Sequence, residues 1–171
     1  MRIAFAGQSR SGKDEAISYL SKQTTGSWIK LHIADEIYSI AHRIKGEDVD
    51  NTNPEDRRLL QDIGMAGRRF DPNVWIDKLI QNIDQFDYYR TERIFVTGIR
   101  FKNEVQALRE HGVTVILLKR DKELREELGA PKEPHETEVP LEEGLFKPED
   151  IIHNNSSLAV FHKSLFDRFL K

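Results

Sequence analysis

The stretch "RIAFAGQSRSGKDE", residues 2–15, determines the fold class of this chain of 171 residues. It opens on the apolar run RIAFA, which is typical of a short buried strand. Gly7, Gly12 and Lys13 then follow with the G-x-x-x-x-G-K spacing of a phosphate-binding loop. The next residue is Asp14, where that pattern usually has a hydroxyl that binds Mg²⁺.

The context of this loop supports phosphate binding. A strand precedes it, and Ala16, Ile17 and Leu20 give the helical spacing after it. Glycines let backbone N–H groups surround phosphate oxygens, and the helix N-terminus adds its positive end. Lys13 would bridge the terminal phosphates of a nucleoside triphosphate. A tight turn with a surface lysine is the alternative, and the order of strand, loop and helix disfavours it. The phosphate-contacting candidates are Gly7, Gln8, Ser9, Arg10, Ser11, Gly12, Lys13 and Asp14.

Asp14 has two interpretations that spacing does not separate. A carboxylate here could bind Mg²⁺ directly or through water, since Mg²⁺ favours carboxylates and keeps several waters. It could equally be an acid near a helix start, where the helix dipole stabilises negative charge.

Composition sets the broad class. With 38% hydrophobic and 32% charged residues, the chain is expected to be a soluble, globular, single domain over residues 1–171. A net charge of -3 argues against a nucleic-acid polymer as partner. The chain has no cysteine, so disulfides and thiolate metal sites are excluded. It shows neither a membrane-length apolar run nor a signal peptide, and we expect a cytoplasmic protein with no membrane partner.

Short apolar runs alternate with helical patterns along the chain. After the first strand, further strands are expected at residues 28–33, 93–97, 113–118 and 150–152. Such alternation predicts an α/β, three-layer fold with a five-stranded parallel sheet and helices on both faces.

Several helices have marked ends. Asn53 and Pro54 predict one start, and Asp71 with Pro72 predicts another. A helix from Lys102 is expected to end at Gly112. Two apolar stripes recur at helical spacing, and most positions of the first are expected to face the core. They comprise Trp75, Leu79, Ile83 and Phe86, and Leu158, Phe161, Leu165 and Phe169.

Basic residues suggest anionic ligands. Arg100 follows the 93–97 strand at its carboxyl end, where open α/β sheets bind ligands. A cation at a helix start is electrostatically unfavourable, which favours an anionic partner. Proteins with such a phosphate-binding loop usually have an acid at the end of a central strand. Here Gly98 follows the strand instead, so that acid is missing.

A second basic group lies on the helix that starts near Asn53. Residues eleven apart on a helix differ by about 20° in direction. The pairs Arg57/Arg68 and Arg58/Arg69 would therefore share faces. They suggest an acceptor phosphate held by guanidinium groups, although solvated helix faces explain many such charges.

The "PHETE" segment, residues 134–138, is only half of the zinc-protease pattern H-E-x-x-H, because residue 139 is valine. His135 and Glu138 are candidates for lid or substrate contacts. An exposed loop without function is the alternative.

Several segments together resemble the phage-type deoxynucleoside monophosphate kinases, within the larger group of P-loop kinases. They occur in family order and span nearly the whole chain. The segments are "SGKD" (11–14), "LHIADEIY" (31–38), "RRLLQDIG" (57–64), "RRFDPNVWIDKL" (68–79), "TGIRFKNEVQALREHGVTVILLKR" (97–120), "HETE" (135–138) and "DIIHNNSSLAVF" (150–161).

The resemblance implies roles for individual residues. An Asp after the loop lysine is usual in this family and in phosphomevalonate kinases. Arg120 matches a basic lid residue of the family. Asn155, together with Asn154, matches the loop that lines the adenine. The implied acceptor-binding region is about residues 34–88, and the lid about 121–140. The implied substrate contacts are Asp35, Arg58, Arg68, Arg69, Trp75, His135 and Glu138. Two departures are Gly98, where the family usually has Asp, and Tyr38, near which it tends to have a basic residue.

The resemblance implies transfer of the terminal phosphate of ATP to a (deoxy)nucleoside monophosphate. Lys13, Arg100 and Arg120 would be catalytic, and Asp14 would bind Mg²⁺. Two alternatives are a P-loop kinase for another small phosphorylated metabolite, as in phosphomevalonate kinase, and a nucleotide-binding module without transferase activity. We expect a monomer or homodimer with a nucleotide substrate.

Overall fold

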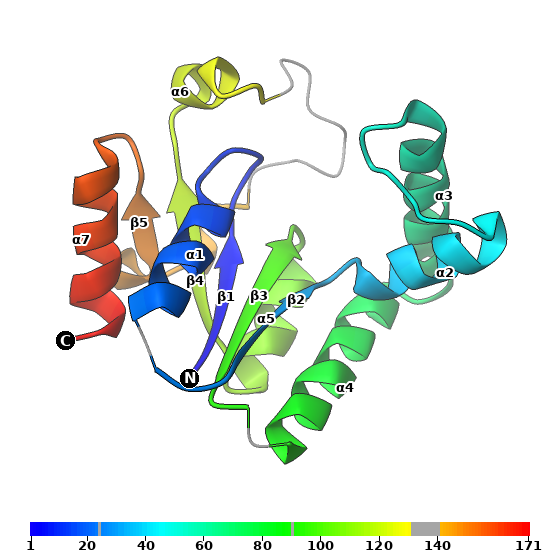
Figure 1. The fold of residues 1–171 in the computed structure, drawn as a ribbon, viewed down its shortest axis with the longest axis horizontal. Helices are drawn as coiled ribbons and strands as arrows, with labels where there is room; N and C mark the ends of the chain where they lie inside the picture. Colours follow the sequence, from blue (N-terminus) through cyan, green and yellow to red (C-terminus); the bar gives the residue numbers. More distant parts are fainter. Residues whose placement is uncertain (24, 90, 131–140) are drawn as a thin grey trace.

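The sheet has the order β2-β3-β1-β4-β5, and every pair of neighbouring strands is parallel (Figure 1). The computed structural model describes residues 1–23, 25–89, 91–130 and 141–171. The strands are β1 (Arg2–Ala6), β2 (Trp28–His32), β3 (Arg93–Ile99), β4 (Thr114–Lys119) and β5 (Ile151–His153). The helices are α1 (Lys13–Gln23), α2 (Asp35–Lys45), α3 (Pro54–Phe70), α4 (Val74–Tyr88), α5 (Lys102–Glu110), α6 (Lys122–Glu127) and α7 (Leu158–Phe169), with short 3-10 helices η2 (Glu143–Leu145) and η3 (Pro148–Asp150).

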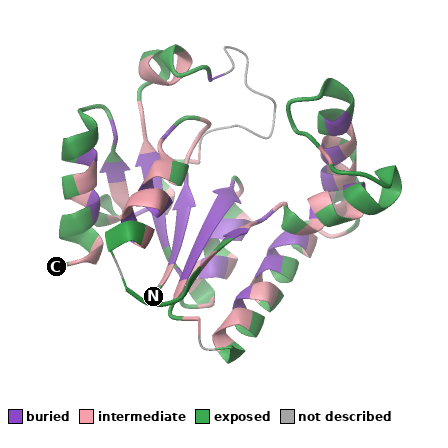
Figure 2. Ribbon diagram, in the orientation of Figure 1, coloured by how far each residue is buried: buried purple, intermediate pink, exposed green. Residues whose placement is uncertain are grey.

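Alternate residues of the strands face opposite layers of helices. On β1, Ile3 and Phe5 pack with α1 and α7, whereas Ala4 and Ala6 face the side of α4 and α5. Strands β1, β3 and β4, between these layers, are the most buried part of the molecule (Figure 2). This arrangement confirms the three-layer α/β fold expected from the sequence.

Helices α2 and α3 lie beyond the carboxyl end of β2, to one side of the sheet (Figure 1). Asn53 caps α3 as expected, since its side chain accepts from the backbone N–H groups of Glu55 and Asp56. The apolar residues on the helix face, including Leu60, pack against α2 and α4 in the larger core cluster.

The expected start of α4 at Asp71 and Pro72 is wrong. The backbone N–H of Asp71 donates to Gly67 O at 2.9 Å and closes α3 instead. Its carboxylate accepts from the N–H of Asn73 at 2.9 Å. Asp71 and Pro72 therefore form the turn between two helices, and α4 begins at Val74.

The apolar stripes of α4 and α7 are largely buried, as expected for the first. On α7, Phe161 and Leu165 are in the core and Phe169 is half-buried, but Leu158 is 55% exposed. Leu158 is exposed because it lies in the first turn of the helix. Among the described residues, each helix is too short or too polar to cross a membrane.

Strand β3 carries an irregularity near its carboxyl end. Ala4 pairs with Val96, but Ala6 pairs with Ile99, so one extra residue is accommodated on β3. Gly98 lies in this bulge with a φ of +86°, a conformation that residues with side chains rarely adopt. The strand therefore extends two residues past the expected end at Thr97 and places Arg100 directly after the bulge.

Candidate active site

The loop between β1 and α1 has the geometry of a phosphate-binding loop. Gly7 has a φ of +137°, and a Cβ there would lie 2.4 Å from the carbonyl oxygen of Leu118. Gly12 has a φ of +105°, and its Cβ would lie 2.4 Å from Nδ2 of Asn154. Both positions therefore require glycine, for close approach as well as for backbone angle.

Asn154 supports this loop from the far side of β4. Its side-chain amide donates to Ser11 O at 3.0 Å, and its backbone N–H donates to Lys119 O at 2.7 Å. Asn154 is 5% exposed, and Ser11 is fully buried. The segment after β5 thus fixes the shape of the loop, a role that the sequence alone did not indicate.

Lys13 folds back over the loop. Its ammonium donates to Gly7 O at 2.8 Å and to Gln8 O at 2.7 Å, and lies 3.5 Å from the hydroxyl of Ser11. The positive charge is therefore held within the ring of loop backbone, beside the N-terminus of α1. Phosphate oxygens would meet both the ammonium and the helix dipole there.

Asp14 lies next to Lys13 and is paired with Lys30 of β2. The Lys30 ammonium donates to Oδ1 of Asp14 at 2.5 Å. This hydrogen bond is the main reason that the pKa of Asp14 is lowered, so the carboxyl is ionised at neutral pH.

An ionised carboxylate fits a Mg²⁺ site shared with phosphate oxygens, which needs only one or two carboxylates. A cavity opens over the phosphate-binding loop, and Asp14 is the single carboxylate among the described residues that line it. The described residues contain no cluster of three or more His, Cys, Asp or Glu that could hold a metal by itself. Bound phosphates would therefore have to complete the coordination, and Lys30 would have to leave Asp14.

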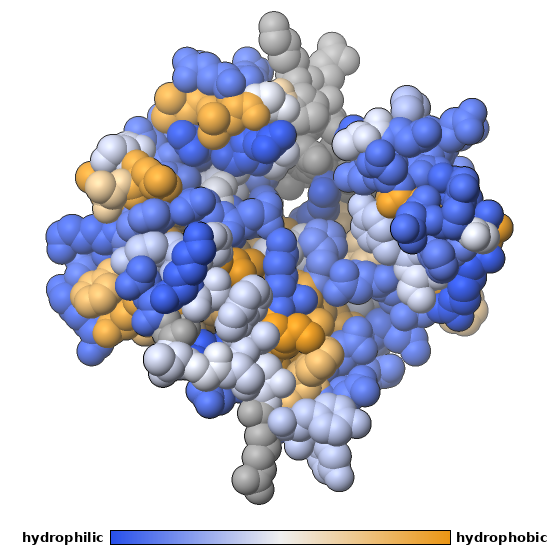
Figure 3. Space-filling view, viewed as in Figure 1, coloured by the Kyte–Doolittle hydropathy of each residue, from blue (hydrophilic) through white to orange (hydrophobic). Residues whose placement is uncertain are grey.

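Two adjoining cavities open at the carboxyl edge of the sheet. The loop cavity, of about 470 Å³, is lined by Gly7, Gln8, Ser9, Arg10, Lys13, Asp14, His32, Asn51, Thr52, Arg57, Gly98, Ile99, Arg100, Gly129 and Leu141. The helical cavity, of about 230 Å³, is lined by His32, Ile33, Ala34, Ile37, Tyr38, Asn51, Arg57, Leu60, Gln61, Gly64, Met65, Arg68, Gly98 and Arg100. Figure 3 shows a hollow bordered by hydrophilic residues on this side of the molecule.

The two cavities share five residues, which are His32, Asn51, Arg57, Gly98 and Arg100. The shared set includes two arginines, so positive charge lies at the boundary. A ligand in one cavity and a ligand in the other would therefore meet at the ends of β2 and β3.

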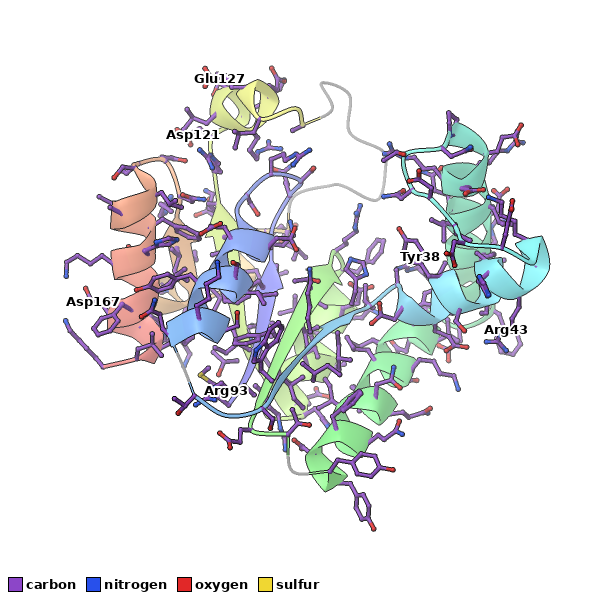
Figure 4. The ribbon with its side chains drawn as sticks, viewed as in Figure 1. Tyr38, Arg43, Arg93, Asp121, Glu127 and Asp167 are labelled. Atoms are coloured by element: carbon purple, nitrogen blue, oxygen red, sulfur yellow. The ribbon has the colours of Figure 1, made fainter. Side chains whose placement is uncertain are left out.

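Three arginines and a tyrosine give the helical cavity its chemistry. Arg57 and Arg68 line it from one face of α3, as their spacing of eleven residues indicated. Arg100 follows β3, and Tyr38 extends from α2 (Figure 4). Burial is the main cause that raises the pKa of Tyr38, so its phenol is neutral at pH 7. The cavity thus offers cationic forks together with an aromatic surface.

Arg68 is anchored to the core by Glu104 of α5. Its guanidinium lies 3.4 Å from Oε1 of Glu104 and 4.7 Å above the ring of Phe101. Glu104 is 2% exposed and accepts from the backbone N–H groups of Arg100 and Phe101 at 2.8 and 3.1 Å. Burial is the largest influence on Glu104 and raises its pKa. Glu104 therefore holds the turn that presents Arg100.

Four residues expected on the acceptor side do not line these cavities. Arg58 and Arg69 are exposed, and Arg58 lies 4.0 Å from Asp62 on its own helix. Trp75 is 5% exposed, and its indole N–H donates to Gly64 O at 2.9 Å. The carboxylate of Asp35 accepts from the backbone N–H of His32 at 2.7 Å. Trp75 and Asp35 thus support the structure around the site.

The expected lid is described only in part. Arg120 lines a third cavity of about 270 Å³, together with Gln8, Ser11 and Arg125. The Nε atom of Arg120 is buried and has no hydrogen-bond partner among the described residues. Helix α6, between Asp121 and Glu127 in Figure 4, begins where Asn155 accepts from the N–H of Asp121 at 2.9 Å. His135 and Glu138 lie outside the described residues.

His32 is the residue at this site that sequence reasoning missed. It ends β2 and lines both cavities. Its Nδ1 accepts from the backbone N–H of Ala34 at 3.0 Å. Burial is the main cause that lowers the pKa of His32, so the ring is neutral at pH 7. The "LHIADEIY" segment by itself does not indicate that its histidine lies at the site. The ring of His32 lies there because it packs beside Gly98, which is on β3 and distant in the sequence.

With this geometry described, the chain was compared with known proteins. It is 37% identical over 159 residues to Uncharacterized protein ORF77 of Ictalurid herpesvirus 1 (strain Auburn), which covers 93% of this chain and 66% of that protein. It is 32% identical over 123 residues to Uncharacterized protein ORF76 of the same virus, which covers 69% of this chain and 47% of that protein. The chain thus spans less than two thirds of the length of both relatives. No protein-family model matches the chain.

Among solved structures, an unliganded sugar kinase from Janibacter sp. HTCC2649 matches with a TM-score of 0.54 and 17% identity. The match covers 96% of this chain and 91% of the sugar kinase. The chain therefore shares its three-layer α/β fold with this kinase. At this level of identity the likeness concerns the fold, and the substrate has to be inferred from the site.

Proposed function

We propose that this chain is an ATP-dependent kinase that phosphorylates a (deoxy)nucleoside monophosphate. The observation that carries the proposal is the pair of adjoining cavities, one built on the phosphate-binding loop and one lined by Arg57, Arg68 and Arg100. ATP would lie along the loop cavity, and the acceptor phosphate would lie in the helical cavity. The transferred group would pass the boundary that the cavities share.

The reaction needs positioning and charge neutralisation more than covalent chemistry by the protein. An oxygen of the acceptor phosphate would form a bond to the γ-phosphorus while the bond to the β–γ bridging oxygen breaks. Lys13 would hold the donor phosphates, and Arg100 and Arg57 would neutralise charge at the boundary. Arg120 would approach the donor from the third cavity, where its Nε is buried beside the loop.

Mg²⁺ bound with ATP would neutralise charge on the donor phosphates. Asp14 is the residue that would hold it, because its carboxylate is ionised and faces the loop cavity. Gly98 supplies no second carboxylate from β3. The remaining donor oxygens would come from ATP and water.

One observation favours a second candidate, a kinase for a smaller phosphorylated metabolite. Trp75 is in the core and cannot stack on a base in the helical cavity, whose volume is about 230 Å³. Tyr38 offers an aromatic surface in its place, which is why the nucleotide remains our first proposal.

A coupled assay of ADP release tests both candidates. The protein would be incubated with ATP, Mg²⁺ and a panel of nucleoside and deoxynucleoside monophosphates, together with small phosphorylated metabolites. We expect at least one nucleoside monophosphate to be converted to its diphosphate, and Lys13→Ala to abolish turnover. Conversion of only non-nucleotide acceptors would support the second candidate. ATP binding without transfer to any acceptor would contradict the kinase proposal.

A further inference from the structure

The imidazole of His32 fills the space that a side chain at position 98 would occupy. A Cβ built on Gly98 would lie 2.6 Å from both Cε1 and Nε2 of this ring, and 3.0 Å from Cγ2 of Ile33. Real Cβ atoms essentially never approach other atoms so closely, so a side chain at position 98 would require the ring of His32 to shift. A side chain from β2 therefore occupies the space at the end of β3.

Hydrogen bonds fix the orientation of the ring. Because the backbone N–H of Ala34 donates to Nδ1 at 3.0 Å, Nδ1 must carry a lone pair. The proton of the neutral ring is then on Nε2, the atom that faces Gly98. The backbone N–H of His32 is held by the carboxylate of Asp35 at 2.7 Å, which fixes the same turn. No described residue accepts a hydrogen bond from Nε2.

The electrostatic surroundings keep this donor neutral. Burial lowers the pKa of His32, and Arg100 and Lys30 lower it further, against the opposing influence of Asp35 and Asp14. A neutral N–H group can bind a phosphoryl oxygen without competing with the cations that neutralise its charge. It also lies on the boundary that the loop and helical cavities share.

We propose that His32 is a catalytic residue of this site, whose Nε2–H donates a hydrogen bond to an oxygen of the phosphoryl group transferred between the two cavities. The inference rests on the proposed kinase function and names a residue for it. His32 neither accepts nor releases a proton in this step. The acceptor oxygen forms its bond to phosphorus as the bond to the ADP oxygen breaks, and the hydrogen bond from Nε2 strengthens as charge shifts on the transferred group.

The test compares wild type with His32→Ala and His32→Gln in one assay of phosphoryl transfer. Loss of one such donor from a transition-state site lowers kcat by roughly 10²-fold. We expect His32→Ala to lower kcat to this extent with little change in KM for ATP. Glutamine carries an N–H donor at similar reach, and we expect it to restore at least part of kcat. Thermal unfolding of each variant monitors packing.

A cycle with Gly98 separates the donor from a purely structural role. Gly98→Ala would push the ring aside and should lower kcat in the wild-type background. In the His32→Ala background the same change should cost far less, because the ring is no longer there. Equal losses in both backgrounds would trace the effect to the backbone of residue 98 and would overturn the proposal.

The controls distinguish this inference from the proposed function. An active wild type with unchanged kcat in His32→Ala overturns the role of His32 alone. Equal kcat in His32→Ala and His32→Gln, with both low, also overturns it, because the donor would not matter. A wild type inactive with every acceptor overturns both the kinase function and the role of His32.

Discussion

Arg57 and Arg58 are adjacent in the chain and both exposed, yet Arg57 lines both cavities, whereas Arg58 lies beside Asp62 and lines neither. A step of one residue turns a helix by about 100°, which is enough to move a side chain from the cavity to solvent. The sequence resemblance favoured Arg58 for the acceptor side, whereas Arg57 is the one of the two that lines the helical cavity. This pair therefore supplies a variant and its matched control.

Arg57→Ala should weaken binding of the acceptor. A hydrogen bond to a charged group is worth about 1.5–3 kcal/mol, which corresponds to an increase in KM of roughly 10–100-fold. Arg58→Ala removes the same charge from the same helix and should change KM by less than twofold. Steady-state kinetics with varied acceptor gives both values. A larger effect for Arg58 would place the acceptor on the other face of α3.

Lys30→Met should make Mg²⁺ easier to bind. The Lys30 ammonium donates to Asp14 and competes with any cation for that carboxylate. Its removal should lower the Mg²⁺ concentration needed for half-maximal activity severalfold, whereas Asp14→Asn should raise it. The measurement is activity against free Mg²⁺ at saturating ATP. If Asp14→Asn leaves this dependence unchanged, Asp14 is not a metal ligand.

Asn154→Ala should loosen the phosphate-binding loop. It removes the donor to Ser11 O from a buried position, and a buried group left without its partner costs about 1–3 kcal/mol. We expect a loss of stability of this order in urea unfolding and a higher KM for ATP. Asn155→Ala is the neighbouring control, because Asn155 is exposed and contacts the start of α6. A loss confined to Asn155→Ala would show that the loop does not depend on Asn154.

Trp75→Phe should affect stability and not substrate binding. The change removes the hydrogen bond from the indole to Gly64 O, which is worth about 1 kcal/mol. The KM values for ATP and acceptor should stay within twofold of wild type. A selective rise in KM for the acceptor would mean that Trp75 contacts the substrate after all.

Glu104→Gln should change how stability depends on pH. Burial raises the pKa of Glu104 above its ordinary value of 4.5, so the folded protein holds this proton more tightly than the unfolded chain. Stability from this group is therefore present at low pH and decreases as pH rises from 4.5 through the folded pKa. The variant should lack this decrease. Unfolding free energies measured from pH 4 to pH 8 for both proteins give the difference, and parallel curves would contradict the prediction.

Local signals in the sequence predicted the fold well. RIAFA, the loop glycines and the cap at Asn53 act through neighbours in the chain, and the structure places each as expected. The prediction of where α4 starts was wrong because Asp71 ends α3. An Asp-Pro pair that ends one helix has the same local sequence pattern as one that begins the next.

The site was less predictable because its contacts join distant parts of the chain. Periodicity paired Arg57 with Arg68 but could not decide which face of the helix lines the cavities. Trp75 has an N–H that suits either a ligand or a backbone carbonyl, and only packing against Gly67 and Gly64 decides between them. The neighbourhood of His32 and Gly98 depends on the pairing of β2 with β3.

The close approach of Gly98 to His32 limits which residues related chains can carry at these two positions. Two positions 66 residues apart compete for one volume, so a side chain at position 98 requires the group at position 32 to shift or to be smaller. We expect relatives with an acid at position 98 to favour a small residue at position 32, whereas relatives with glycine can keep the histidine. Covariation of these two positions would show that the group at this end of the sheet can come from either of two neighbouring strands.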